Sequence, residues 1–247
     1  MRPELATISL AVGFAVVTML VYRLTPAGRI SADRTGRGGS FVLGFWIRNW
    51  FYWFIRPITA LSISMALSPF VFNALAVLFG VAAMVAYALG HLPTAGWMVL
   101  LSGFADVMDG EVARGRNVAD ARGAFLDSTL DRFSEFFAFI GMAYFYRGEI
   151  GALLVVAALG GSLLVSYTRA RGESVGVLCK LGIMQRAERM LLVGIGSIVD
   201  PWLSATFGWP EGRILEWIVG VIAVGTIATS VYRTVWISNA LRDRSGE

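Results

Sequence analysis

The sequence is poor in the side chains that form cross-links or bind soft metal ions. Among its 247 residues it has one cysteine, Cys179, and one histidine, His91. A single cysteine excludes an internal disulfide. His91 stands close to Pro93 in a short polar break, where we expect an ordinary loop residue rather than a ligand. Lysine is equally rare, since Lys180 is the only one and the other basic residues are arginines.

Charge is also scarce. Charged residues make up 15% of the chain, hydrophobic residues make up 56%, and the mean hydropathy is +0.66. A soluble domain is usually about 25% charged and about 45–50% apolar. The composition therefore excludes an ordinary soluble domain and predicts an integral membrane protein. In this setting the net charge of +4 fits a lipid headgroup surface and anionic substrates rather than nucleic acid, and we expect no nucleic-acid partner.

The apolar runs predict an all-α, polytopic membrane helical bundle. A membrane helix needs roughly 20 mostly apolar residues. The first run reads as an uncleaved anchor, because no small-residue cleavage site follows Tyr22 and a basic stretch with Arg23, Arg29, Arg34 and Arg37 comes next. The other six runs would form the core. The predicted spans lie near residues 7–22, 69–90, 94–114, 124–146, 150–168, 187–207 and 213–236.

Residues 41–60 differ in kind, because aromatic side chains are mixed there with Arg48, Asn49 and Arg56. This pattern favours a helix lying in the membrane interface, with an ordinary spanning helix as the alternative. The predicted organisation is thus an anchor and basic linker over 1–40, followed by one catalytic domain over 41–247. That domain would hold the interfacial helix 41–60 and six membrane helices within 69–236.

Arginine is unevenly distributed between the predicted connections, and positive residues mark the cytoplasmic side. The connections near 91–94, 147–149 and 200–213 carry only Arg147 and Arg213. The connections around 114–122 and 169–189 are rich in positive charge, so we expect them to face the cytoplasm in a multi-pass protein of the cell membrane. Their basic residues are Arg114, Arg116, Arg122, Arg169, Arg171, Lys180, Arg186 and Arg189.

Four carboxylates interrupt two of the apolar spans. A charged side chain at the centre of a membrane helix costs about 2.5–3.5 kcal/mol on insertion scales, so this segment is the first place to look for function. Asp106 and Asp109 are three residues apart and Asp127 and Asp131 are four apart. Each spacing puts its pair on one helix face, and the short connection between the helices predicts that the two faces meet.

Such a cluster cannot stay fully ionised without cations. Oxygen ligands without histidine or cysteine favour Mg²⁺, Mn²⁺ or Ca²⁺, and four carboxylates could hold two ions for displacement at phosphorus. Gly110 and Ala113 leave the adjacent helix surface bare for a nucleotide, and Arg114 adds a donor for phosphate. The alternative is that these are helix-end carboxylates paired with nearby arginines, namely Arg114, Arg116, Arg122 and Arg132.

The segment resembles the signature of the CDP-alcohol phosphotransferase family. It reads Asp106-Val-Met-Asp109-Gly110-Glu-Val-Ala113-Arg114, then eight residues, then Gly123-Ala-Phe-Leu-Asp127-Ser-Thr-Leu-Asp131. The resemblance implies a six-helix membrane enzyme, commonly a homodimer. Such an enzyme attacks the phosphorus next to the lipid of a CDP-linked donor and releases CMP. Small residues such as Gly160 and Gly161 could permit the close helix contact of a dimer.

The resemblance also implies a role for each matching residue. Asp106, Asp109 and Asp127 would bind the metal ions, and Asp131 would be the catalytic base with a possible metal contact of its own. The nucleotide contacts would come from Gly110, Ala113, Arg114 and Gly123. Family members often have Pro-Asn-x-x-Thr at the start of the first core helix. Here Pro69-Phe-Val-Phe-Asn73 stands in that place, which makes Asn73 a weaker candidate for the nucleotide.

A second polar region points to the acceptor. Tyr167-Thr-Arg169-Ala-Arg171-Gly-Glu173 and Gln185-Arg186-Ala-Glu188-Arg189 flank one connection, and Arg233 lies at the inner end of the last helix. Converging arginines suggest an acceptor that carries a phosphate, although a basic loop holding anionic lipid is the alternative. The stretch is similar to phosphatidylinositol-phosphate and archaetidylinositol-phosphate synthases. That resemblance implies a phosphate clamp of Arg169, Arg189 and Arg233, supported by Arg171 and Arg186.

The sequence therefore predicts a phosphotransferase dependent on Mg²⁺ or Mn²⁺. It would join inositol 1-phosphate to the phosphatidyl group of a CDP-diradylglycerol. Glycerol 3-phosphate or another alcohol is an alternative acceptor for the same chemistry. A cation transporter that uses the aspartates to carry its ion is an alternative of another class. Transporter sites usually lie near the midplane between inverted repeats, whereas these carboxylates lie toward one face and no repeat is visible.

Overall fold

The computed structural model describes residues 3–25, 44–179 and 182–245. The basic residues Arg29, Arg34 and Arg37 of the predicted linker, and Lys180, lie outside these ranges. The described residues form helices and no strand, which confirms the all-α prediction. The helices are α1 (Pro3–Leu24), α3 (Gly44–Ser64), α4 (Pro69–Ala88), α5 (Leu92–Gly115), α6 (Ala121–Phe145), α7 (Ile150–Ser174), α8 (Arg186–Phe207) and α9 (Arg213–Ser245).

Local sequence explains where several helices begin. Ser68 caps α4 by accepting a hydrogen bond from the backbone N–H of Phe70 at 3.3 Å, and Pro69 follows it at the first helical position. Asp120 caps α6 by accepting from the backbone N–H of Gly123 at 2.7 Å. At the start of α8 the carboxylate of Glu188 accepts from the backbone N–H of Gln185 at 3.0 Å. These caps satisfy N–H groups that a helix start leaves without partners.

Small residues bring the helices of the bundle close together. A Cβ built on Gly80 of α4 would lie 2.7 Å from the Cα of Ser134 on α6, and one on Gly96 of α5 would lie 2.5 Å from the carbonyl oxygen of Gly194 on α8. Gly161 of α7 packs in the same way against Thr226 of α9. Gly161 therefore serves the contact between α7 and α9 within one chain, because these helices can approach each other only where it lacks a side chain. The sequence suggests Gly161 for a contact with a second copy, and the packing of α7 on α9 takes up that position instead.

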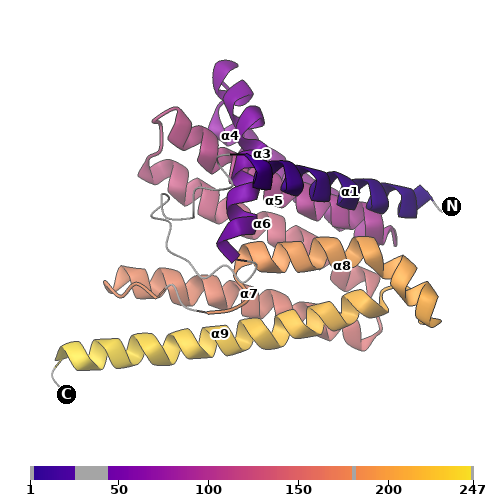
Figure 1. Cartoon of the computed structure of the whole chain (residues 1–247). Coiled ribbons are helices and arrows are strands. Elements are labelled where there is room, and N and C mark those ends of the chain that lie inside the picture. The colour runs from indigo at the N-terminus through magenta and orange to yellow at the C-terminus, as the bar shows by residue number, and fades with distance from the viewer. Residues whose placement is uncertain (1–2, 26–43, 180–181, 246–247) are drawn as a thin grey trace.

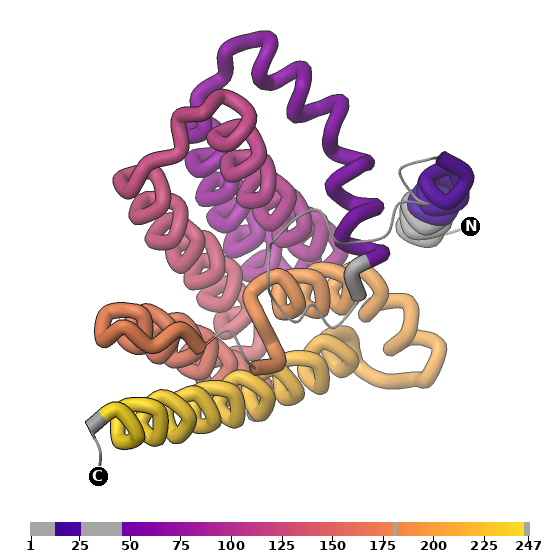
Figure 2. The backbone as a smooth tube through the Cα atoms, turned by 60° about the vertical axis from the view of Figure 1, so that its left-hand side comes forward, coloured from indigo at the N-terminus to yellow at the C-terminus, as the bar shows by residue number. Residues whose placement is uncertain are grey.

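Two apolar cores support this arrangement. The larger one includes residues of all the helices from α4 through α9 and is centred on Tyr87, Phe139 and Met142. The smaller one lies between α3, α4 and α5 and includes Ile55, Phe72 and Met108. In Figure 1, α8 and α9 lie across the view one above the other, and α3 runs steeply to both. Figure 2 shows α3 passing from the side of α1 to the start of α4. Helix α1 contacts α3 through its aromatic residues, with the ring centroids of Tyr22 and Trp53 5.5 Å apart.

Within the described residues, four helices are long and apolar enough to cross a membrane, namely 69–88, 150–174, 186–207 and 213–244. The composition and these helices identify a membrane protein. Helices α5 and α6 are also long enough, at 24 and 25 residues, but they carry the acidic cluster. Six core spans, an interfacial α3 and the two-part division of the chain remain predictions. The helix predicted at 41–60 is observed as Gly44–Ser64, with Pro57 in its interior.

Candidate active site

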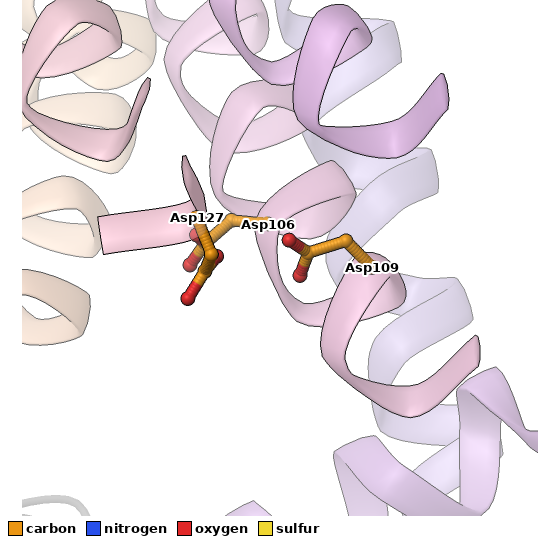
Figure 3. A group of neighbouring side chains, drawn as sticks. All are labelled: Asp106, Asp109 and Asp127. Carbon is orange, nitrogen blue, oxygen red and sulfur yellow. The ribbon is translucent and has the colours of Figure 1, made fainter. Parts of the chain in front are cut away.

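Three of the four aspartates meet where α5 and α6 face each other. One carboxylate oxygen from each of Asp106, Asp109 and Asp127 lies within 4.8 Å of the other two. Figure 3 shows Asp109 pointing toward Asp106 and Asp127. Asp109 is buried, and its carboxylate also accepts a hydrogen bond from the backbone N–H of Gly110. This all-oxygen donor set of three negative charges fits a hard divalent cation such as Mg²⁺ or Mn²⁺.

Asp131 stands beside this group and is linked to it by an arginine from α8. Nη1 of Arg186 lies 2.6 Å from Oδ2 of Asp106 and 2.9 Å from Oδ2 of Asp131. Nη2 of Arg186 also donates to the hydroxyl of Ser134 at 3.2 Å. Arg132 is a looser neighbour of Asp131, at 3.6 Å. The fourth carboxylate is thus held by charge-assisted contacts, one turn further along α6 than Asp127.

Pairing with nearby arginines does not account for the acidic cluster. Arg114 pairs with Glu111 at 2.7 Å, and Arg116 donates to the carbonyl oxygens of Ala66 and Leu67 at 3.0 and 2.7 Å. That alternative named Arg114, Arg116, Arg122 and Arg132. Of these, only Arg132 has a described ion pair with one of the four aspartates. The chief partner, Arg186, comes from a helix more than fifty residues away in sequence.

A single cavity of about 1640 Å³ joins the acids to the second polar region. Its charged part includes Asp106, Asp127 and Asp131 from α5 and α6 together with four arginines from α7, α8 and α9, namely Arg169, Arg186, Arg189 and Arg233. Beyond Asp106 toward the start of α5, and beyond Met190 along α8, the lining is mainly apolar. It is made by residues such as Trp97, Leu100, Phe104, Leu191, Ile195 and Val199. One cavity thus offers a charged region and an apolar region, as a lipid-linked phosphate requires.

The arginines of the predicted phosphate clamp differ in how they are held. Arg189 is 1% exposed and binds both carboxylate oxygens of Glu135, with Nε to Oε1 at 2.8 Å and Nη2 to Oε2 at 3.0 Å. Arg233 is buried and donates to the carbonyl oxygen of Val165 at 2.9 Å. Arg169 is exposed and pairs with Glu173 at 3.0 Å.

Arg171 lies outside the cavity lining, although the sequence grouped it with the other four arginines. Its Nη1 lies 3.4 Å from the hydroxyl of Ser174 at the end of α7. The described structure therefore gives Arg169, Arg186, Arg189 and Arg233 a common space and places Arg171 on the neighbouring surface.

The predicted nucleotide contacts are also not among the residues that line the cavity. Gly110, Ala113 and Arg114 follow Asp109 along the last turns of α5. The absence of a side chain on Gly110 leaves room for the guanidinium of Arg114, because a Cβ built there would lie 3.1 Å from Arg114 Nη2. Gly123 lies in the first turn of α6, and Asn73 is buried in α4.

Sequence reasoning missed Glu135, which is buried and holds Arg189. It follows Asp131 by four residues, just as Asp131 follows Asp127, so the three acids form a stripe on one face of α6. That repeated spacing was the available signal. The partner on α8, 54 residues later, could be found only from the fold.

Comparisons with known proteins agree with this arrangement. Residues 63–227 match the model of the CDP-alcohol phosphatidyltransferase family. The archaetidylinositol phosphate synthase of Methanothermobacter thermautotrophicus is 46% identical over 125 residues, which are 49% of this chain and 63% of that protein, less than two thirds of its length. The phosphatidylinositol phosphate synthase of Streptomyces avermitilis is 32% identical over 212 residues, covering 81% of this chain and 84% of that protein.

Solved structures extend the likeness to the fold. A crystal structure of the phosphatidylinositol phosphate synthase of Mycobacterium tuberculosis with CDP-DAG bound is 27% identical, with a TM-score of 0.64. The match covers 73% of this chain and 92% of that one. The same enzyme in complex with manganese and citrate gives a TM-score of 0.65 and coverage of 73% and 87%. The residues that match the family model include all four aspartates, and the chain belongs to the CDP-alcohol phosphatidyltransferase family of transferases.

Proposed function

We propose that the protein transfers the phosphatidyl-type group of a CDP-diradylglycerol to inositol 1-phosphate and releases CMP. The observation that carries this proposal is the shared cavity, in which three acids of α5 and α6 face four arginines of α7, α8 and α9. The acids suit a phosphoryl transfer that depends on a divalent cation, and the arginines suit an acceptor that already bears a phosphate.

The reaction is a displacement at the phosphorus attached to the lipid. An oxygen of the acceptor hydroxyl forms a bond to this phosphorus, the bond from the phosphorus to the bridging oxygen of CMP breaks, and the hydroxyl proton passes to Asp131. Asp106, Asp109 and Asp127 would hold Mg²⁺ or Mn²⁺, with two ions per site and Asp131 as a further ligand. Bound there, divalent cations supply positive charge for the diphosphate oxygens. The chain's own contribution is to position the donor, the acceptor and the base.

Each substrate has a matching part of the site. The apolar part of the cavity suits the lipid chains of the donor, and Asn73, Gly110, Ala113, Arg114 and Gly123 would contact its cytidine nucleotide. Arg169, Arg189 and Arg233 would bind the acceptor phosphate, with Arg186 as support. Arg171, which lies outside the cavity lining, would act only from the surface. The names of the relatives support an inositol phosphate acceptor, and their two kinds of lipid leave the donor's chains open.

The setting of the enzyme is also part of the proposal. The arginine-rich connections would place the site at the cytoplasmic face of the cell membrane, and the protein would act as a homodimer. Family membership favours transfer chemistry over the cation transporter that the acidic cluster alone allowed.

CMP release tests the reaction and its acceptor together. Purified protein in detergent is incubated with CDP-diacylglycerol, Mg²⁺ or Mn²⁺, and one acceptor at a time: inositol 1-phosphate, inositol, glycerol 3-phosphate, serine or water. We expect the fastest release with inositol 1-phosphate, none after chelation with EDTA, and recovery when the metal is added back. Faster release with glycerol 3-phosphate would overturn the acceptor assignment. Cation flux into liposomes without any CMP release would overturn the reaction.

A further inference from the structure

The contact between Glu135 and Arg189 is the most fully buried ion pair described in the bundle. The side chains are 3% and 1% exposed, and the guanidinium meets the carboxylate in a two-pronged contact. Nη1 of Arg189 also donates to the carbonyl oxygen of Met184 at 2.7 Å. Three of the five N–H groups of an arginine are therefore engaged in the described contacts, which leaves two for another acceptor.

The elements that carry this pair are themselves fixed. Helix α6 is held to α4 next to Glu135, where Gly80 leaves no space above the backbone of Ser134. On the other side, Arg189 lies in the first turn of α8, just after the cap formed by Gln185 and Glu188. The guanidinium is thus held in one orientation by two helices and by the connection before α8.

A purely structural role does not explain why a charged pair stands here. A buried ion pair often contributes no more to stability than apolar residues of similar volume, and the surrounding core is apolar. Arg189 does line the reaction cavity, which it shares with Arg169 and Arg233. Its guanidinium is therefore held in place at the edge of the space proposed for the acceptor.

We propose that Glu135 is a positioning residue that fixes Arg189 for the phosphate of the acceptor and so selects phosphorylated over unphosphorylated alcohols. A guanidinium that is already oriented loses little freedom when an anion binds, and a site whose remaining N–H groups are placed for a phosphate discriminates against an acceptor that leaves those hydrogen bonds unmade. This inference rests on the proposed use of a phosphorylated acceptor, and Glu135 itself touches neither substrate.

The test measures both Michaelis constants in Glu135→Gln. The amide keeps the size of the carboxylate but loses its charge and one of its two acceptor oxygens, so Arg189 is no longer held on both sides. We expect the KM for inositol 1-phosphate to rise about tenfold, the equivalent of one charge-assisted hydrogen bond, with the KM for CDP-diacylglycerol unchanged. The ratio of rates with inositol 1-phosphate and with inositol should fall. Glu135→Asp keeps the charge and should retain most of that ratio.

Glu216→Gln is the matched control, since Glu216 is a buried glutamate paired with Arg213 at 2.5 Å outside the reaction cavity. It should leave both KM values unchanged. If Glu135→Gln raises both KM values equally, or changes neither, Glu135 does not position the acceptor site. If that variant does not fold, the same KM comparison in Glu135→Asp decides.

The wild-type protein separates this inference from the proposed function. No CMP release with any phosphorylated acceptor would overturn both. Release with a different phosphorylated acceptor would overturn the inositol assignment alone, and the comparison of Glu135 variants then uses that acceptor. Wild-type dependence on inositol 1-phosphate that Glu135→Gln leaves intact would overturn only the role of Glu135.

Discussion

Asp131 stands apart from the three aspartates that cluster together. Asp106, Asp109 and Asp127 each bring a carboxylate oxygen within 4.8 Å of the other two, whereas Asp131 lies one turn further along α6 and shares the guanidinium of Arg186 with Asp106. Its side chain is 12% exposed and lines the cavity, so an acceptor hydroxyl can reach it. A carboxylate in this place is suited to take a proton, while the group of three is suited to hold cations.

Asp131→Asn should therefore lower kcat for CMP release by about 10²–10⁴-fold, the usual contribution of a general base, because the amide cannot accept the hydroxyl proton. The matched control is Asp120→Asn on the same helix. Asp120 is an exposed cap outside the cavity, and asparagine is an equally good capping residue. The control should keep full activity. Retention of wild-type kcat by Asp131→Asn would remove Asp131 from the reaction.

At the residue scale, the sequence predicted what helix periodicity determines. The spacings of three and four residues put the acids on facing sides of α5 and α6, and the structure brings three of them within 4.8 Å. The contacts made by α8 could not be read in this way. Arg186 reaches Asp106 and Asp131 only because α8 packs against α5, and no local pattern in the sequence specifies that neighbour.

The helices illustrate a second limit of sequence reasoning. The predicted spans at 69–90 and 187–207 are observed as 69–88 and 186–207, but the predicted 150–168 and 213–236 continue to residues 174 and 245. Hydropathy marks only the apolar part of a helix. Arginine, alanine and leucine, which are good helix formers, carry α7 and α9 further as polar helices. The apolar runs therefore indicated where the helices lie and did not show how far α7 and α9 extend beyond the apolar part.

Close packing of α4 on α6 makes Gly80 sensitive to substitution, and Gly160 on α7, which has no close neighbour, is its control. At Gly80 a new Cβ would meet the backbone of Ser134, which cannot move aside without shifting α6. Gly80→Ala should therefore lower the free energy of unfolding by about 1–3 kcal/mol, as overpacking usually does, and should reduce activity with it. At Gly160 there is nothing within 4 Å, so Gly160→Ala should be neutral or slightly stabilising. Thermal unfolding in detergent measures both, and equal effects would contradict the packing.

Helix α1 lies outside the segment that matches the family model, yet it contributes Ala15 to the lining of the cavity. The replacement Ala15→Trp should fill part of this space and weaken donor binding by about 1 kcal/mol, roughly fivefold in the donor KM. The acceptor KM should stay constant, because the arginines lie on α7, α8 and α9. Val17→Trp is the control, since Val17 is 57% exposed on the same helix. Equal donor KM values in the two variants would show that α1 does not form a wall of the donor site.

At the scale of the whole molecule, the sequence predicted that two distant polar regions serve one site, and the structure joins them through one cavity. The size of that cavity and its apolar lining depend on how seven helices pack. They could not be predicted from spans taken one at a time. The direction in which the bundle crosses the membrane is predicted from a different feature, the uneven distribution of arginine between the two sets of connections.

The scarcity of cysteine makes this direction directly measurable. Cys179 is the only native thiol and is 3% exposed, so a cysteine introduced into an exposed connection should dominate labelling by a membrane-impermeant maleimide. His91 and Val118 are exposed at opposite ends of α5, and Val118 lies at the end near the acids. In intact cells we expect His91→Cys to react at once and Val118→Cys to react only after permeabilisation. The unmodified protein should stay unlabelled, and the reverse pattern would place the reaction cavity on the outer face, where cytoplasmic nucleotide and acceptor could not reach it.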